Sequence, residues 1–437
     1  MIGSVTSILV TTWIAFRTPG AALYFLRHPL QVQEVHALLT GLLSANLLVL
    51  QVIFLARLPW LERAWGRTVL MRRHRRLGQW SFGLMVAHVL LFAVQRQLQD
   101  RARPGAALLR VFLLDPWMLI ATIGTLVLVL VVVTSATRAR RRIRYESWHL
   151  IHLWAYVGIA LALPHQLVSR DFATGWTVPY WWGLYLAALG AVLWFRVGVP
   201  IVRSARHRLR VVDVRPESGG ATTITMTGRC LDRLRVSAGQ FFIWRFLGSS
   251  GRTRGHPYSL SAAPTADRLR ITVGRTGDAG RRAAGLQIGV RVVVEGPYGS
   301  VVGDRRRHPR LLLLSAGIGI TPFRSLLERL PLRPGEAVLI HRVHDSTTAV
   351  LLAEMTELAR RRNVELIVLT GARRADGSWL PAGHVADDAP ELQRLVPDVA
   401  DRDVLICGPP EWTTAVRAAT LAAGVARRDV QIEEFGW

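Results

Sequence analysis

The stretch "RRHRRLGQWSFGLMVAH", from Arg72 to His88, decides how the first half of the chain folds. His74 lies inside an arginine cluster, and His88 lies fourteen residues later in an apolar segment. Ionisable side chains are costly inside a membrane and are usually retained there for function. The stretch therefore predicts a membrane helix that carries a functional imidazole at each of two depths.

Long apolar runs surround this stretch and fill much of residues 1–200 of the 437-residue chain. A helix needs about 20 mostly apolar residues to cross a bilayer. The start of the chain lacks the basic leader and the cleavage site of a signal peptide. We expect about six crossings, at Ile2–Phe16, Val35–Ala56, Gly78–Val94, Val111–Val133, Trp148–Leu163 and Tyr180–Val202.

The net charge of +25 comes from arginine, because the chain contains no lysine. A basic chain can indicate a nucleic-acid partner, but here the arginines gather between spans, seven in residues 57–77 and five in residues 138–144. Basic loops stay on the cytoplasmic side. We therefore expect no nucleic acid, but a multi-pass protein in contact with lipid, in a bacterial inner membrane. Its residues from 205 onward would then be cytoplasmic.

A second pair of histidines, His152 and His165, lies thirteen residues apart in the fifth span. At 1.5 Å per residue, both gaps cover about 20 Å of helix, and both helices run outward. His74 and His152 would share the inner depth, and His88 and His165 the outer depth. This arrangement predicts two stacked haems, each with its iron held by one histidine from each helix.

Several alternatives stay open at these sites. A hydrogen-bonded histidine or a proton relay would also explain an intramembrane imidazole. His149 is an alternative inner ligand, and His36 is better explained as an interfacial residue. Fourteen residues return within about 40° of the same helix face, but thirteen miss it by about 140°. We expect Pro164 to rewind the fifth helix. Four arginines either pair with haem propionates or only set the topology: Arg72, Arg73, Arg75 and Arg76.

Both histidine segments, "HRRLGQWSFGLMVAH" and "YESWHLIHLWAYVGIALALPHQ", resemble the paired haem-ligand helices of the ferric reductase and NADPH oxidase superfamily. The resemblance implies two b-type haems. Their implied ligands are His74, His88, His152 and His165.

Residues 205–437 read as two soluble domains that follow a membrane bundle over residues 1–204. Short alternating strands over residues 205–304 predict an antiparallel β-barrel. It contains "HPYSLSAAP", from His256 to Pro264, in which an aromatic ring followed by a hydroxyl can contact a flavin. Strand–helix alternation over residues 305–437 predicts an α/β domain with a parallel sheet.

The α/β domain begins with "RLLLLSAGIGITPFRSLLERL", from Arg310. Gly317 and Gly319 allow a close approach to a pyrophosphate at a helix start, where Pro322 replaces a third glycine. A later strand ends in Cys407, Gly408 and Pro409. Ligands bind at the carboxyl ends of parallel strands, where both turns fall.

The ordered motifs "HPYS", "GIGITP", "CGPP" and the terminal "EEFGW" are similar to those of the ferredoxin–NADP reductase module. The resemblance implies a flavin site and a nicotinamide site. Phe435, or alternatively Trp437, would cover the flavin, and Cys407 would lie near the nicotinamide ring with Gly408 and Pro409. The other implied flavin contacts are His256, Pro257, Tyr258 and Ser259, and the dinucleotide contacts are Gly317, Gly319, Thr321 and Pro322.

Three departures from the reductase pattern leave choices open. His256 stands where many relatives have arginine, so Arg254 is an alternative contact for the flavin phosphates. No serine or threonine follows Gly277-Asp278, which leaves FAD, our first choice, open against FMN. Arg342 would favour NADPH over NADH if it held a 2′-phosphate.

These observations predict a transmembrane oxidoreductase. Electrons would pass from cytoplasmic NAD(P)H through FAD and two haems to an outer acceptor, with ferric chelates as first choice, then dioxygen to give superoxide, then a quinone or a redox protein. The alternatives are a haem sensor or relay subunit without its own turnover, and a transporter fused to a flavoprotein. The two cysteines, Cys230 and Cys407, fit a reduced compartment.

Overall fold

The computed structural model describes residues 29–99, 105–136, 143, 145–168, 177–248, 255–275, 277–299, 306–374 and 376–434. The chain divides into two compact units, Met1–Arg196 and Val197–Trp437. The expected first span, Ile2–Phe16, lies outside the described residues.

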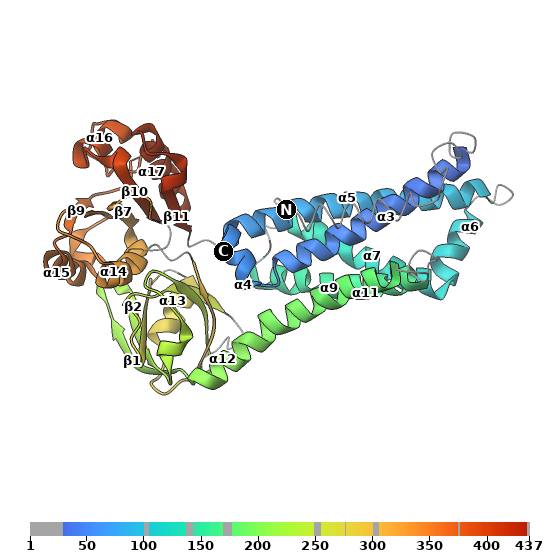
Figure 1. Ribbon diagram of the computed structural model, residues 1–437, viewed down its shortest axis with the longest axis horizontal. Helices are drawn as coiled ribbons and strands as arrows, with labels where there is room; N and C mark the ends of the chain where they lie inside the picture. The colour runs from blue at the N-terminus through green and yellow to red at the C-terminus, as the bar shows by residue number, and fades with distance from the viewer. Residues whose placement is uncertain are drawn as a thin grey trace. The chain divides into compact units, whose positions relative to one another are not determined.

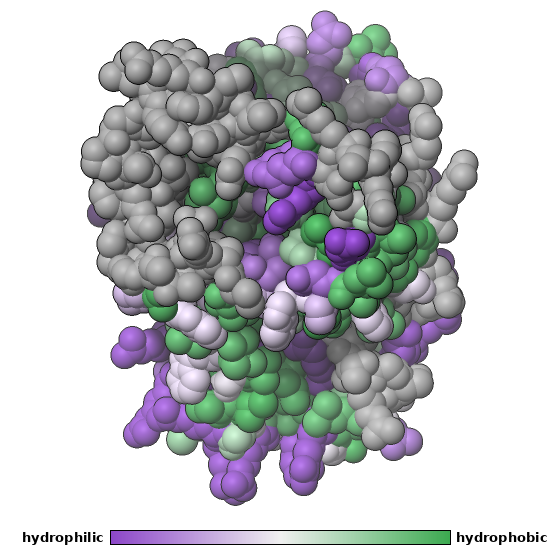
Figure 2. Space-filling view, turned by 90° about the vertical axis from the view of Figure 1, so that its right-hand side faces the viewer, coloured by the Kyte–Doolittle hydropathy of each residue, from purple (hydrophilic) through white to green (hydrophobic). Residues whose placement is uncertain are grey.

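The first unit is helical throughout its described elements (Figure 1). Five helices in the described ranges are long and apolar enough to cross a membrane, and they match the second to sixth expected spans. Large hydrophobic side chains such as Leu126, Leu150 and Leu186 are exposed on these helices, and green apolar side chains reach the surface on the face in Figure 2. The elements are α3 (Pro29–Phe54), α4 (Pro59–Trp65), α5 (Arg67–Gln99), α6 (Ala106–Leu109), the π-helix η1 (Arg110–Leu114), α7 (Pro116–Ser135), α9 (Tyr145–Val168), α11 (Thr177–Ala191) and the π-helix η2 (Val192–Gly198), which crosses the unit boundary.

The helices of this unit pack chiefly in two pairs, α3 with α5 and α7 with α9. Gly124 of α7 and Gly158 of α9 allow the second pair to approach closely, since a Cβ on Gly124 would lie 2.7 Å from the Gly158 carbonyl oxygen. Small residues at a crossing point are typical of membrane helices. Each histidine-bearing helix, α5 and α9, therefore has its own packing partner.

The second unit begins with α12 (Val199–His207) and two antiparallel sheets, ordered β1-β2-β5 and β4-β3-β6. Single bridges, Arg210 to Arg291 and Leu260 to Ile271, join the edges of the two sheets. Their inner faces share one core, in which Phe242, Trp244 and Ile271 are fully buried. The elements are β1 (Arg210–Pro216), η3 (Ser218–Gly220), β2 (Thr222–Thr227), η4 (Leu231–Leu234), β3 (Phe241–Phe246), β4 (His256–Ser259), β5 (Arg268–Val273), α13 (Gly277–Ala284) and β6 (Val292–Tyr298).

A five-stranded parallel sheet, ordered β11-β10-β7-β8-β9, forms the rest of the unit. Each face of the sheet is covered by its own apolar cluster, as the near-continuous hydrophobic strands require. The predicted α/β domain is thus present. Its elements are β7 (Arg310–Ala316), η6 (Gly317–Gly319), α14 (Ile320–Arg329), β8 (Ala337–Val343), η7 (Ser346–Thr348), α15 (Leu352–Arg362), β9 (Glu365–Thr370), α16 (Asp388–Leu395), η8 (Val399–Asp401), β10 (Arg402–Gly408), α17 (Pro410–Ala422), η9 (Arg427–Asp429) and β11 (Val430–Glu434).

Candidate functional site

The inner histidines of α5 and α9 face one another. The ring centroids of His74 and His152 are 6.1 Å apart, and the rings are steeply inclined, at 71°. A metal binds an imidazole nitrogen at about 2 Å, so a metal between two imidazoles would separate the centroids by about 6 Å. The observed spacing therefore suits two axial ligands of one iron.

The second ring nitrogen of each inner histidine already has a partner. His74 Nδ1 lies 3.1 Å from the carbonyl oxygen of Gln51. His152 Nδ1 lies 3.2 Å from Ser135 Oγ, and the His152 ring stacks on Trp148. Histidine ligands generally use one nitrogen for the metal and donate the other N–H to a neighbouring group. The contacts at Nδ1 leave Nε2 of both histidines for a metal.

The outer histidines lie on the same two helices as the inner pair, His88 on α5 and His165 on α9. His88 Nδ1 lies 2.7 Å from the carbonyl oxygen of Ala37. Gly41 makes room for this ring, because a Cβ there would lie 2.7 Å from His88 Nδ1. His165 Nδ1 is buried near the backbone of Ala162.

The contacts between α3 and α5 follow one regular register. Ala37 contacts His88, and Gln51 contacts His74. Between these two contacts, the hydroxyl of Ser44 donates to the Ser81 carbonyl oxygen and the hydroxyl of Ser81 donates to the Ser44 carbonyl oxygen. The three contacts are seven residues apart on both helices, which is two helical turns. The same geometry therefore orients the inner and the outer histidine of α5.

Three residues near the histidine pairs in sequence, His149, Pro164 and Arg73, are also candidate parts of this site. The ring of His149 contacts Trp148, whereas His152 faces His74. The α-helix α9 continues through Pro164 to Val168, and the expected rewinding at this proline stays a prediction. The Arg73 guanidinium lies over the Trp65 ring, 4.0 Å from its centroid.

The predicted flavin strand, β4, pairs with β3 in the antiparallel sheet. The rings of His256 and Tyr258 stack at 6.0 Å, and the Tyr258 carbonyl accepts a hydrogen bond from Trp244 Nε1. Burial raises the pKa of Tyr258 to about 12, although nearby Arg282 opposes the shift. Ser259 is buried at the end of the strand, and Pro257 pairs with Ile243.

Sequence reasoning missed Arg282. The segment "GDAGRRAAG", read as a departure from a phosphate loop, contains α13, and Arg282 on this helix lies 3.4 Å from His256 Nε2. A guanidinium beside the flavin strand can bind phosphate. Arg254, Phe435 and Trp437 lie outside the described residues.

The two predicted nucleotide turns meet at the carboxyl edge of the parallel sheet. A Cβ on Gly319 would lie 2.2 Å from the Cys407 carbonyl oxygen, so only glycine fits there. Gly317 has a positive φ of 55°. Thr321 donates to the Ile318 carbonyl oxygen, and Pro322 is buried in α14. On the facing turn, Gly408 is followed by Pro409, the residue preceding α17.

Two residues predicted to contact the nicotinamide dinucleotide, Cys407 and Arg342, instead have side chains that contact other parts of the protein. The Cys407 side chain is fully buried in the apolar cluster with Ile320 and Phe323, and burial raises the pKa of its thiol. Arg342 is buried and donates to the carbonyl oxygens of Val343 and Ala372. Its guanidinium therefore holds two chain segments together. Both cysteines are free, as expected.

Comparison with known proteins agrees with both halves of this description. Residues 40–163 match the family described as "Ferric reductase like transmembrane component". Residues 313–418 match the family described as "Oxidoreductase NAD-binding domain". The chain therefore contains one segment of the ferric reductase-like transmembrane type and one of the oxidoreductase NAD-binding type. The predicted resemblance is confirmed. The first matched segment includes His74, His88 and His152 and ends two residues before His165.

Relatives of this ferric reductase-like protein match its soluble half. It is 32% identical over 237 residues to the ferredoxin reductase component of 3-ketosteroid-9-alpha-monooxygenase from Mycolicibacterium smegmatis, over 52% of this chain and 65% of that protein. It is 27% identical to respiratory burst oxidase homolog protein F of Arabidopsis thaliana, over 42% of this chain and 21% of that protein. The FAD/NAD-binding domain of nitric oxide dioxygenase from Vibrio cholerae aligns with 22% identity and a TM-score of 0.41, over 52% of this chain and 98% of that one. The chain spans less than two thirds of the length of these two curated relatives.

A buried histidine in the NAD-binding domain predicts a pH dependence of stability. His341 is fully buried, and its Nδ1 lies 2.8 Å from Ser315 Oγ. Burial lowers the pKa of His341 to about 4, against 6.5 in an unfolded chain. As the pH falls below 6.5, the unfolded state binds this proton and the folded state does not. The free energy of unfolding should therefore drop by about 3 kcal/mol between pH 7 and pH 4 on this account alone.

Thermal unfolding of the detergent-solubilised protein across this pH range measures the effect. His341→Gln should flatten the dependence, whereas His344→Gln, at an exposed position in the same domain, should not. If the stability of His341→Gln kept the wild-type dependence on pH, groups other than His341 would cause that dependence.

Proposed function

We propose that this protein is a transmembrane oxidoreductase that passes electrons from cytoplasmic NAD(P)H, through FAD and two b-type haems, to an acceptor on the outer side. Ferric chelates are the first-choice acceptor. The observation that carries the proposal is the pairing of His74 with His152 across two membrane-length helices, in a chain that also has an NAD-binding domain.

Four histidines would hold the two haem irons. His74 and His152 would hold the inner iron through Nε2, while Gln51 and Ser135 fix the two ring planes. His88 and His165 would hold the outer iron, with the Ala37 carbonyl oxygen orienting His88. Neighbouring groups that orient a ligand also tune the metal, so α3 contributes to both sites without a side-chain ligand.

The soluble unit would position FAD and the nicotinamide. When bound, flavin accepts a hydride and releases single electrons, which haem iron can accept one at a time. Tyr258 and Ser259 would contact the flavin ring from β4, and His256 with Arg282 would bind its phosphates. We take the two bridged sheets as one barrel. Gly317 and Gly319 would admit the dinucleotide pyrophosphate to the start of α14.

The orientation follows from the arginines between the helices. The runs in residues 57–77 and 138–144 would stay inside, which makes the protein multi-pass with its NAD-binding domain in the cytoplasm. A bacterial inner membrane is the proposed location.

The acceptor is the least constrained part of the proposal, because a fold does not fix a substrate. One relative carries the name respiratory burst oxidase, which makes dioxygen, reduced to superoxide, the second candidate acceptor. A quinone or a partner redox protein is third. A haem relay or sensor subunit without turnover would contain the same histidine pairs.

A reduced-minus-oxidised spectrum of the purified protein tests the proposal. We expect the sharp visible bands of bis-histidine haem at a ratio of two haems per chain, and steady NAD(P)H oxidation with a soluble ferric chelate. A haem-free protein would rule out the proposal and favour a transporter. Haem without turnover on ferric chelate, dioxygen or quinone would favour the relay subunit.

The contact between Gly41 and His88 gives a sharper test of the outer site. Gly41→Ala would press a methyl group against the His88 ring and displace it. We expect roughly tenfold weaker haem binding at this site, the scale of neighbouring-group effects on metal ligands. Haem per chain, measured as the pyridine haemochrome, is the readout. Gly83→Ala is the matched control, because a Cβ on this α5 glycine meets nothing within 4 Å. Equal haem content in both variants would contradict the assignment of His88.

A further inference from the structure

A cluster of three side chains that can bind a metal lies at the amino edge of the parallel sheet, the edge opposite to the two nucleotide turns. His308 precedes β7, Asp403 is the second residue of β10, and Asp429 ends η9 just before β11. One ligand atom from each residue lies within 4.8 Å of the others. The nucleotide turns follow the opposite ends of β7 and β10, about 20 Å away along strands of this length.

The two carboxylates of this cluster are buried, with Asp403 only 2% and Asp429 only 4% exposed. Asp429 Oδ1 accepts no hydrogen bond from the described residues. Its closest cationic groups are the Nε atoms of Arg307 and Arg428, at 3.9 and 3.8 Å, and both arginines are largely exposed. Exposed ion pairs contribute little, and a buried carboxylate without a close partner is costly. The Oδ1 atom of Asp429 can therefore accept a closer cation, while its Oδ2 atom pairs with His308.

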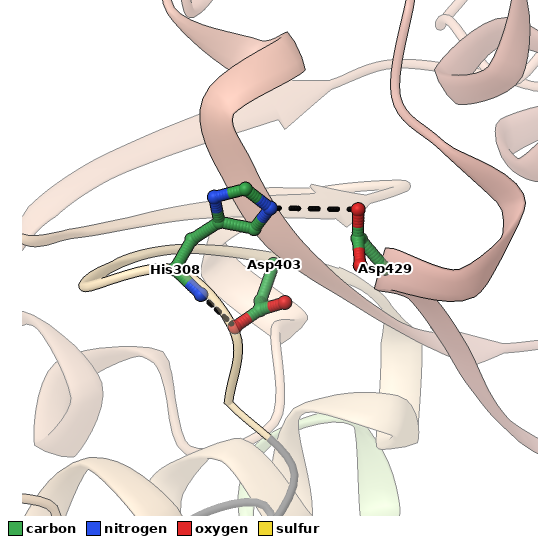
Figure 3. A group of neighbouring side chains, drawn as sticks. All are labelled: His308, Asp403 and Asp429. Carbon is green, nitrogen blue, oxygen red and sulfur yellow. Dashed lines mark hydrogen bonds and ion pairs between the residues drawn. The ribbon is translucent and has the colours of Figure 1, made fainter.

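One pair of the three ligand atoms already has the spacing that a metal needs, and all three lie within 4.8 Å of one another (Figure 3). His308 Nε2 points at Asp429 Oδ2 at 3.4 Å, and two ligands each about 2 Å from a tetrahedral metal lie about 3.3 Å apart. Asp403 Oδ2 accepts hydrogen bonds from the backbone N–H groups of Arg307 and His308, which fixes the segment that carries the imidazole. His308 is one-third exposed, so solvent reaches its side chain.

We propose that His308, Asp403 and Asp429 bind one divalent transition metal of the zinc class. One imidazole and two carboxylates form a mixed donor set of the kind that zinc accepts. The metal would link the segment before β7 to the starts of β10 and β11. These three segments are far apart in the sequence. It would stabilise the NAD-binding domain from the edge opposite to its nucleotide turns.

The test is zinc binding by the full-length, tag-free protein after chelator treatment. We expect one Zn²⁺ per chain by equilibrium dialysis with elemental analysis, and a melting temperature that rises with added Zn²⁺. His308→Ala and Asp429→Asn should each weaken binding at least about tenfold and abolish the rise. His344→Ala, at an exposed position in the same domain, should behave as the wild type.

Flavin reduction by NAD(P)H, measured in every variant, shows that the domain remains folded. Zinc that binds equally well in His308→Ala would overturn the proposal, as would a wild type that binds none. A melting temperature lowered in the variants but insensitive to Zn²⁺ in the wild type would instead assign the cluster to an ion-pair network.

Discussion

His88→Ala is expected to lower the haem content from two to one per chain and to stop electron transfer to the outer acceptor. The variant removes one of two axial ligands at the outer depth, and Phe92 and Gly41, which contact the ring, offer no replacement donor. The inner pair, His74 and His152, stays intact, as do the flavin and nucleotide sites. Flavin reduction by NAD(P)H should therefore proceed at the wild-type rate while ferric chelate reduction falls to background.

Stopped-flow absorbance separates these steps, because flavin bleaching and haem reduction are observed at different wavelengths. Phe92→Leu, a change beside His88 that keeps the ligand, is the control, and it should retain both haems. If His88→Ala kept two haems, the ligand assignment at the outer site would be wrong. If it lost both, the two sites would be coupled through the α3–α5 register.

The second large effect is expected from Gly319→Ala. A Cβ at this position would lie 2.2 Å from the Cys407 carbonyl oxygen and 2.7 Å from its carbonyl carbon, and backbone atoms cannot swing away as a side chain can. Overpacking of this kind costs about 1–3 kcal/mol. Because the clash separates the two nucleotide turns, we expect the KM for NAD(P)H to rise by about 10- to 100-fold.

Steady-state kinetics with varied NAD(P)H checks this result. Haem content and flavin content should be unchanged, since neither site contacts η6. Gly285→Ala is the matched control in the same unit, because a Cβ there meets only ordinary contacts at 3.9 Å. A Gly319→Ala enzyme with wild-type KM would place the dinucleotide elsewhere.

The long apolar helices could be predicted from local sequence, since five expected spans are described as helices long enough to cross a membrane. The depth of each histidine stays a prediction from helix rise and arginine placement. The hydrogen-bond partners of the histidine rings could not be predicted from the sequence. Ala37 and Gln51 act through backbone carbonyl oxygens, and every residue has one, so no side-chain type marks them. The helix α5 also begins at Arg67, before the expected apolar span, which places His74 well inside a helix.

In the second half of the chain, the order of motifs predicts the domains but not the direction of individual side chains. Strand alternation places Cys407 on the same face as Leu405, which points into the apolar core, and this signal was available in the sequence. Arg282 was not predicted as a site residue because its segment lacks the serine or threonine expected after Gly277-Asp278. His308, Asp403 and Asp429 are distant in sequence and meet only when the parallel sheet forms.

The regular contacts between α3 and α5 limit how the distance between the two iron sites can change. Inserting one residue between His74 and His88 would turn the rest of α5 by about 100°, and one imidazole would lose its carbonyl partner. Adding seven residues to α3, α5 and α9 together would instead keep each ring close to its orientation and move the two histidine pairs apart by about 10 Å. The α3–α5 register therefore tolerates a change in this distance by two full turns.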